Sequence, residues 1–184
     1  MTNFTSAHSD TEAKAQARQA VLDFLPEKVE KIISLPAESF LFEAAVKIRY
    51  PKVKIYGYER EKKIMNKNMI NQPLIPKTLL YDYIKQDVFQ SSLEDIDFAW
   101  LDLCSNPTTQ TQFDFIRLTN SAKPGLRIIL TVSRKLRNIK EDKSHVTVDR
   151  LIKVINCFSR NGKVVRKYDY VNGRSPMTML FIQF

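Results

Sequence analysis

Short apolar runs, rich in β-branched and aromatic residues, alternate along this 184-residue chain with stretches of helical periodicity. Runs of this length and composition are typical of strands that are buried on both faces of a sheet. The predicted strands cover residues 31–35, 53–58, 79–85, 98–103 and 126–132, and the predicted helices cover 40–49, 60–69, 108–121 and 147–159. Because the strands alternate with helices, this order predicts a parallel sheet with helices on both faces.

The two ends of the chain add elements of another kind. Ser9-Asp10-Thr11-Glu12 fits a helix capping box, and an alanine-rich helix is predicted between it and Pro26. Asn172-Gly173 separates two strand-like runs, 164–171 and 177–184, and this pattern predicts a hairpin. We therefore expect an α/β fold with a mostly parallel seven-stranded sheet that ends in a C-terminal antiparallel hairpin.

A formal net charge of +9 favours a polyanionic partner such as nucleic acid, although solubility alone also explains it. The length favours one domain, which we expect over residues 9–184 after a disordered segment over 1–8. The two cysteines and two histidines show no metal-ligand spacing, so we expect no metal site. The sequence has neither a long apolar stretch nor a signal-peptide pattern, so we expect a cytoplasmic protein without a membrane partner.

Three of the predicted strands lead into an acidic residue. Glu59 follows the second strand, Asp87 follows the third, and Asp102 follows the apolar run Phe98-Ala99-Trp100-Leu101. Ligands of open α/β sheets bind beyond the carboxyl ends of the strands, so these carboxylates predict a site for a ligand rich in hydroxyl, amino or cationic groups. Two of these positions also have a structural interpretation, since Glu59 suits the start of a helix and Asp87 suits a turn or an N-cap.

The layout resembles the class I S-adenosylmethionine-dependent methyltransferases over about residues 29–184, which implies a three-layer Rossmann-like sandwich. The segment Val53-Lys54-Ile55-Tyr56-Gly57-Tyr58-Glu59 is similar to the second strand of that family, which ends in glycine, a hydrophobic residue and an acid. The resemblance implies that Glu59 accepts hydrogen bonds from both ribose hydroxyls of the cofactor, because the two oxygens of a carboxylate match a vicinal diol.

Two further segments extend the resemblance. Lys85-Gln86-Asp87-Val88 is similar to the family segment that binds adenine, which implies that Asp87 accepts from the amino group and that Val88 offers a backbone donor. The strand ending at Asp102 is similar to the catalytic strand, and the resemblance implies catalytic roles for Asp102 and for Asn106 after it. The residues between them depart from the prolines and the aromatic that the amino-methylating members carry.

The turn after the first strand is the main departure from the family. A glycine-rich turn lets the backbone approach the cofactor, but here the turn carries Pro36, Ala37 and Glu38 and no glycine. The resemblance places these three residues against the cofactor. Glu38 either meets the positive charge of the ligand or fills the pocket and excludes it.

Basic residues follow the fifth predicted strand and predict a rim that binds DNA or RNA through its phosphates: Arg134, Lys135, Arg137 and Lys140. A solvated charged loop is the alternative. The aromatic residues of the second and fourth strands are interpreted as core residues and not as base-stacking platforms: Tyr56, Tyr58, Phe98 and Trp100. Two functions remain open: an S-adenosylmethionine-dependent methyltransferase that acts on nucleic acid, or an inactive Rossmann-like module that binds nucleic acid or protein.

Overall fold

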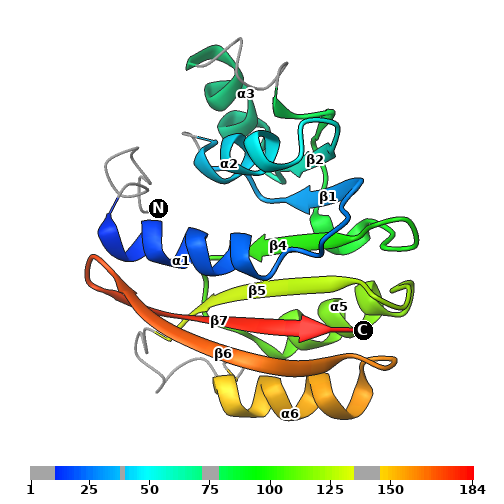
Figure 1. Cartoon of the computed structure of the whole chain (residues 1–184). Helices are drawn as coiled ribbons and strands as arrows, with labels where there is room; N and C mark the ends of the chain where they lie inside the picture. Colours follow the sequence, from blue (N-terminus) through cyan, green and yellow to red (C-terminus); the bar gives the residue numbers. More distant parts are fainter. Residues whose placement is uncertain (1–10, 38–39, 72–78, 135–145) are drawn as a thin grey trace.

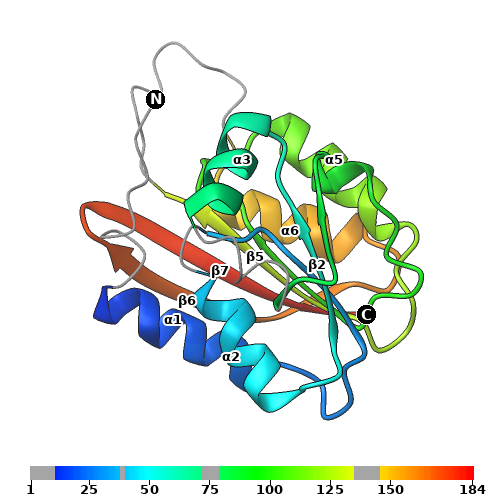
Figure 2. The same ribbon diagram turned by 90° about the horizontal axis from the view of Figure 1, so that it is seen from above.

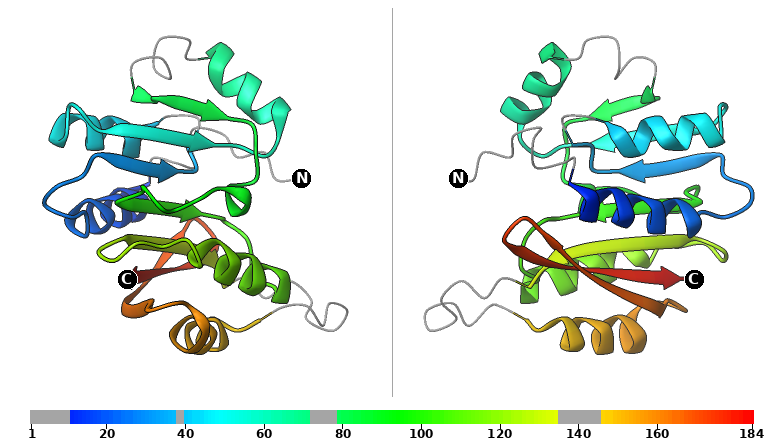
Figure 3. Two further views of the ribbon diagram at one scale, coloured as in Figure 1. Left: turned by 90° about the vertical axis from the view of Figure 1, so that its right-hand side faces the viewer. Right: turned by 60° about the vertical axis from the view of Figure 1, so that its left-hand side comes forward.

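The computed structural model describes residues 11–37, 40–71, 79–134 and 146–184, and these form a seven-stranded sheet in the order β3-β2-β1-β4-β5-β7-β6 (Figures 1 and 3). The strands are β1 (Lys31–Ser34), β2 (Lys54–Tyr58), β3 (Asp82–Ile84), β4 (Phe98–Asp102), β5 (Arg127–Ser133), β6 (Lys163–Asn172) and β7 (Ser175–Gln183). β1 to β5 pair in parallel, and β7 pairs antiparallel with β5 and β6. The predicted sheet with its C-terminal hairpin is confirmed, whereas segment 1–8 lies outside the described residues.

Helices cover both faces of the sheet, as the alternating pattern predicts (Figure 2). The helices are α1 (Glu12–Asp23), α2 (Leu41–Arg49), α3 (Lys62–Asn71), α5 (Thr109–Thr119) and α6 (Val148–Phe158), with a 3-10 turn η2 (Val88–Gln90). α1 and α2 pack on one face, and α5 and α6 pack on the other. Within the described part of the chain, none of these helices has the length and hydrophobicity needed to span a bilayer.

Two apolar cores lie on opposite faces of the sheet, and the middle strands contribute to both. Side chains alternate across a strand, so Phe98 and Trp100 of β4 face α1 and α2, whereas Ala99 and Leu101 face α5 and α6. All four are buried, which a central parallel strand covered on both faces requires. This double burial is the reason that β4 appears in the sequence as an uninterrupted apolar run.

α1 begins two residues later than a cap at Ser9 would allow. Thr11 is its N-cap, and the Thr11 side chain accepts a hydrogen bond from the backbone N–H of Lys14 at 3.3 Å. The small side chains of Ala17 and Ala20 are buried, which brings the helix axis close to the sheet. Thr11 is the N-cap in the structure, and Ser9 and Asp10 of the predicted capping box lie outside the described residues.

α2 begins after a residue in an unusual conformation. Its N-cap is Phe40. Phe40 has a φ of 49°, in the left-handed region that costs a non-glycine residue about 1–2 kcal/mol. The Phe40 ring is fully buried and lies edge-on to Tyr83, with the ring centroids 6.3 Å apart. Packing of the ring therefore holds a bend that glycine would make without strain.

β3 is shorter than the predicted strand over 79–85, because the exposed Asp82 starts it and the chain leaves the sheet after Ile84. Between β3 and β4 the chain forms η2 as its only helical turn. The crossovers on either side of this segment contain α-helices. The α5 side of β1 and β2 is therefore bordered by an irregular segment over 91–97 (Figure 3).

Gly57 in β2 leaves room for the turn after β1. A Cβ at this position would lie 2.8 Å from Pro36 Cγ, 2.9 Å from Leu80 Cδ1 and 3.2 Å from Tyr83 Cδ2. We expect Gly57→Ala to lower the free energy of unfolding by about 2 kcal/mol, because overpacking of a core forces such neighbours apart. Urea denaturation measures the change.

The matched control is Gly173→Asn in the β6–β7 turn, where nothing lies within 4 Å and the φ of 61° suits asparagine. This variant should stay within about 0.5 kcal/mol of the wild type. Equal stabilities of the Gly57→Ala variant and the wild type would show that the turn at Pro36 moves away from the added methyl group at little energetic cost.

Candidate functional site

The three predicted acidic residues lie at one edge of the sheet. β2, β3 and β4 are parallel, with β1 between β2 and β4, so their carboxyl ends point the same way. Glu59 follows β2, Asp87 follows β3, and Asp102 is the last residue of β4. The fold therefore brings these residues to the edge at which open α/β sheets bind ligands.

Two of these acids also hold the local backbone. Glu59 Oε1 accepts a hydrogen bond from the backbone N–H of Glu61 at 2.8 Å, just before α3. Asp87 is the N-cap of η2, and its Oδ1 accepts from the N–H of Phe89 at 3.0 Å. Each contact uses one oxygen and orients the carboxylate. Val88 is buried, with 4% of the residue exposed.

Asp102 is paired with a residue that the sequence did not point to. Lys14 of α1 lies 3.1 Å from Asp102 Oδ2, and the two side chains are 12% and 13% exposed. The thiol of Cys104 lies 3.1 Å from Asp102 Oδ1. Burial lowers the pKa of Lys14, but Asp102 and Cys104 raise it by more, so the amine stays charged. Burial, together with Asp102, raises the pKa of Cys104 well above its usual value, so this thiol stays protonated.

The turn after β1 packs against β2. Pro36 is buried, and the space beside Gly57 is filled by Pro36, Leu80 and Tyr83. Gly57 thus makes room for the chain itself. The turn therefore takes its shape from packing and not from glycine.

A small hollow of about 30 Å³ lies between α1, the start of α2 and the ends of β1 and β4. Its walls are built by Lys14, Arg18, Leu35, Ala37, Leu41, Phe42, Glu43, Trp100 and Asp102. Ala37 and Asp102 are the predicted site residues that line it, and Glu38 lies outside the described residues. The volume is enough for one or two water-sized groups.

Glu43 is the most unusual wall residue of this hollow. It is 2% exposed, and burial raises the pKa of its carboxyl to about 7, although its own backbone N–H and the Ser34 hydroxyl oppose that shift. Ser34 Oγ is itself buried. Sequence reasoning missed Glu43, yet its position beside Phe42 and three residues before Val46, both buried, places an acid on the apolar side of α2.

Asn106 lies in the loop after β4, and this loop is hydrogen-bonded to the segment that leads into α6. The carbonyl of Pro107 accepts a hydrogen bond from the N–H of Val146 at 2.9 Å, just before α6. Asn106 is half-buried at the same edge of the sheet as Asp102. In the residues that the structure describes, no cluster of three or more metal-ligating side chains occurs.

Arg134 follows β5 and so lies at the same edge as the acids. Its side chain is exposed, and Arg134 Nη1 lies 3.5 Å from Asp169 Oδ2 on β6. The remainder of the predicted basic rim lies outside the described residues: Lys135, Arg137 and Lys140.

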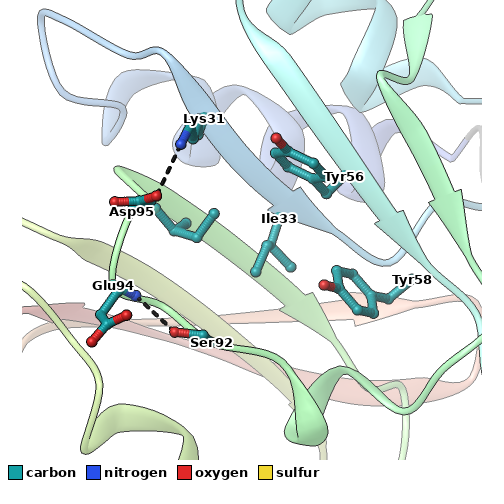
Figure 4. A pocket seen from close by; sticks show the side chains of 8 residues that line it. Lys31, Ile33, Tyr56, Tyr58, Ser92, Glu94 and Asp95 are labelled. Atoms are coloured by element: carbon teal, nitrogen blue, oxygen red, sulfur yellow. Dashed lines mark hydrogen bonds and ion pairs between the residues drawn. The ribbon is translucent and has the colours of Figure 1, made fainter.

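A larger cavity of about 270 Å³ lies on the α5 side of the sheet, bordered by the irregular segment before β4 (Figure 4). Its walls include Ile33, Tyr56 and Tyr58, and at its rim Lys31 Nζ lies 3.1 Å from Asp95 Oδ2. We interpreted both tyrosines as core residues, but each is only partly buried. In the part of the chain that the structure describes, no helix covers this part of β2.

No protein-family model matches the sequence, and no curated protein is significantly similar to it in sequence. Solved structures do resemble the fold. N-methyltransferase NodS from Bradyrhizobium japonicum WM9, in complex with S-adenosyl-L-homocysteine, matches with a TM-score of 0.65 and 9% identity over 99% of this chain and 93% of NodS. Magnesium protoporphyrin IX methyltransferase from Synechocystis PCC 6803, with the same molecule bound, matches with a TM-score of 0.66 and 12% identity over 100% and 89%.

The [4+2]-cyclase SpnF also matches, with a TM-score of 0.65 and 9% identity over 92% of this chain and 81% of that one. At such low identities the likeness shows the fold alone. The chain has the fold of the class I S-adenosylmethionine-dependent methyltransferases, and the predicted fold is thereby confirmed. Because the same fold occurs in a cyclase, the activity must be argued from the residues at the carboxyl edge.

The buried Glu43 predicts that stability falls as the pH rises. The unfolded carboxyl has a pKa of 4.5 and the folded one about 7, so the folded chain holds the proton over this interval and the unfolded chain releases it. The free energy of unfolding should drop by about 3 kcal/mol between these two pH values and change no further from this group above them.

Urea denaturation across this interval, compared with Glu43→Gln, measures the effect. The glutamine variant keeps the size of the side chain and lacks the titrating proton, so its stability should change less with pH. Parallel curves for the two proteins would mean that Glu43 ionises normally.

Proposed function

We propose that this protein is an S-adenosylmethionine-dependent methyltransferase. The observation that carries the proposal is the placement of Glu59 and Asp87 at the carboxyl ends of the neighbouring strands β2 and β3, on the same edge of the sheet as Asp102 at the end of β4. Acids in these places match the hydroxyl and amino groups of an adenosine. The structural neighbours bound to S-adenosyl-L-homocysteine support the same cofactor class.

The donor set fits the adenosine part of the cofactor. Glu59 and Asp87 each use one carboxylate oxygen on a backbone amide, so their second oxygens are the candidate acceptors for the ribose hydroxyls and the adenine amino group. The backbone N–H of Val88 is the candidate donor to the ring. When bound, the cofactor supplies an electrophilic methyl group on a sulfonium.

The residues at the end of β4 are the candidates for holding the methyl acceptor. Asp102 forms an ion pair with Lys14 at the end of β4, and its carboxylate can accept a hydrogen bond from an acceptor N–H or O–H and orient it. Asn106, in the loop that follows, offers an amide for the same purpose. Because methyl transfer needs in-line geometry, this orienting contribution is what the protein can add.

A second function, an inactive binding module, is favoured by the turn after β1. Pro36 packs against Gly57, and the hollow at the end of β1 is about 30 Å³. A chain that never binds the cofactor has no need of Glu59 as a ligand. Cofactor binding therefore separates the two functions.

The proposal predicts that S-adenosyl-L-homocysteine binds and that Glu59→Gln weakens the binding by tenfold or more, on the order of the 1.5–3 kcal/mol of a hydrogen bond to a charged group. Glutamine keeps an oxygen that accepts from Glu61, so α3 should stay in place. Isothermal titration calorimetry gives both affinities. Absence of heat with about 1 mM ligand for the wild type would rule out the methyltransferase and leave the binding module.

Nucleic acid is the proposed acceptor, because the net charge is +9 and Arg134, the first residue of the predicted basic segment, follows β5 at the same edge as Asp102. The Arg134→Glu and Arg137→Glu double variant should bind a labelled single-stranded oligonucleotide at least about tenfold more weakly, with a shallower salt dependence. Fluorescence anisotropy over a salt series measures this.

The control is the Arg160→Glu and Lys163→Glu double variant, which changes the net charge equally at the opposite edge of the sheet, where α6 ends and β6 begins. If both double variants lose binding equally, the attraction is general and the acceptor is not held at the carboxyl edge.

A further inference from the structure

The sheet face on the α5 side of β1 and β2 is open, whereas α5 and α6 cover β4 and β5 on this face. The crossover from β3 to β4, residues 85–97, contains the turn η2 and no α-helix. A parallel sheet is normally covered on both faces, so the cavity of about 270 Å³ lies where a crossover helix would pack. The cavity is several times larger than the roughly 30 Å³ of one water molecule, so it admits a side chain or a small molecule.

Two aromatic rings form much of the cavity wall. Tyr56 and Tyr58 lie on the same face of β2, because side chains alternate along a strand, and Ile33 of β1 lies beside them (Figure 4). The neighbouring Tyr81 ring, 5.3 Å from that of Tyr56 between centroids, already has the Lys54 ammonium 4.8 Å from its centroid. In the described part of the chain, no cation lies over the Tyr56 or Tyr58 ring in this way. Both rings can therefore accept a cation from outside.

The charge at the rim of the cavity is opposite to that of the whole chain. The chain has a net charge of +9, but the residues that line the cavity include two acids, Glu94 and Asp95, and one cation, Lys31. Lys31 Nζ lies 3.1 Å from Asp95 Oδ2, so these two charges neutralise each other. Glu94 is exposed, and its carboxylate forms no ion pair with the residues that the structure describes. The rim therefore keeps one unmatched negative charge.

We propose that this cavity binds a guanidinium group, either on an arginine side chain of a peptide or on a small guanidine compound. A guanidinium is planar and weakly hydrated, stacks on aromatic faces, and has N–H groups whose geometry matches a carboxylate. Its plane stacks on the Tyr56 or Tyr58 ring, and Glu94, which is exposed and free to turn toward the cation, accepts from its N–H groups. The alkyl chain of the ligand packs on Ile33.

This site is separate from the carboxyl edge and does not rest on the proposed function. Lys31 is the first residue of β1, and the segment 91–97 leads into β4, so the rim lies toward the amino ends of these strands. An anion fits poorly there, because the cation of the rim is already paired and an acid is not. A neutral ligand gains nothing from Glu94, which separates it from a guanidinium in a direct test.

NMR titration of protein labelled with ¹³C in the tyrosine rings tests the proposal, with N-acetyl-L-arginine amide as the probe. The signals of Tyr56 and Tyr58, assigned with the variants Tyr56→Phe and Tyr58→Phe, should shift and saturate. N-acetyl-L-citrulline amide has nearly the same shape without the charge. It should bind about fivefold more weakly or worse, because it loses both the cation–π contact and the ion pair.

Glu94→Gln removes the unmatched charge from an exposed position, so the fold should be unaffected. This variant should weaken the arginine probe about threefold and leave the citrulline probe unchanged. The matched control is Glu12→Gln, which removes the same charge from α1 on the other face of the sheet and should change neither affinity. Tyr58→Leu keeps an apolar side chain and should reduce the preference for arginine over citrulline.

Three results would overturn the proposal. The first is the absence of a saturable shift of the Tyr56 and Tyr58 signals with about 10 mM arginine probe. The second is equal affinity of the wild type for the arginine and citrulline probes. The third is an equal effect of Glu94→Gln and Glu12→Gln on the affinity for arginine.

Two further probes separate the two sources of the guanidinium. Butylguanidinium carries the cation on a short alkyl chain, and a blocked pentapeptide with arginine between pairs of glycines carries it on a peptide backbone. Binding of the pentapeptide as tightly as N-acetyl-L-arginine amide would support an arginine of a peptide partner. Binding of butylguanidinium with exclusion of the pentapeptide would support a small guanidine compound.

Discussion

A nearly buried ion pair fixes the geometry of the carboxyl edge. Lys14 and Asp102 join the first helix to the central strand, and both are largely removed from water. Breaking such a pair on one side leaves an uncompensated charge, so the low dielectric that weakens solvation also makes the contact hard to open. Ala17 and Ala20 let the same helix lie close to the sheet. The hollow at the end of β1 has its shape because α1 is held in this way.

The order of strands and helices was predictable because burial leaves a local trace. β4 is covered on both faces, so it appears as a continuous apolar run, and the hairpin appears through Gly173, whose φ of 61° the turn requires. The boundaries of β3 and α2 were not predictable. β3 lies at the edge of the sheet with little apolar sequence, and the N-cap of α2 depends on the packing of Phe40 against Tyr83, a distant residue.

The candidate site was also predictable only in part, because some of its contacts join residues that are distant in the sequence. Acids at strand ends can be located once the strands are known, because parallel topology places them at one edge. The local roles of Glu59 and Asp87 were among the open interpretations. The pairing of Lys14 with Asp102, and the burial of Glu43, depend on how two helices lie against the sheet. No spacing along the chain records that contact.

The bend at Phe40 has a consequence for how such proteins are grouped. Proteins of this fold are usually recognised by glycines after the first strand, but here a buried aromatic side chain supports a left-handed residue at the start of α2. A sequence pattern that demands those glycines passes over any chain that uses this substitute. The relatedness of such chains would then be detected by comparing backbone structures before it is detected by comparing sequences.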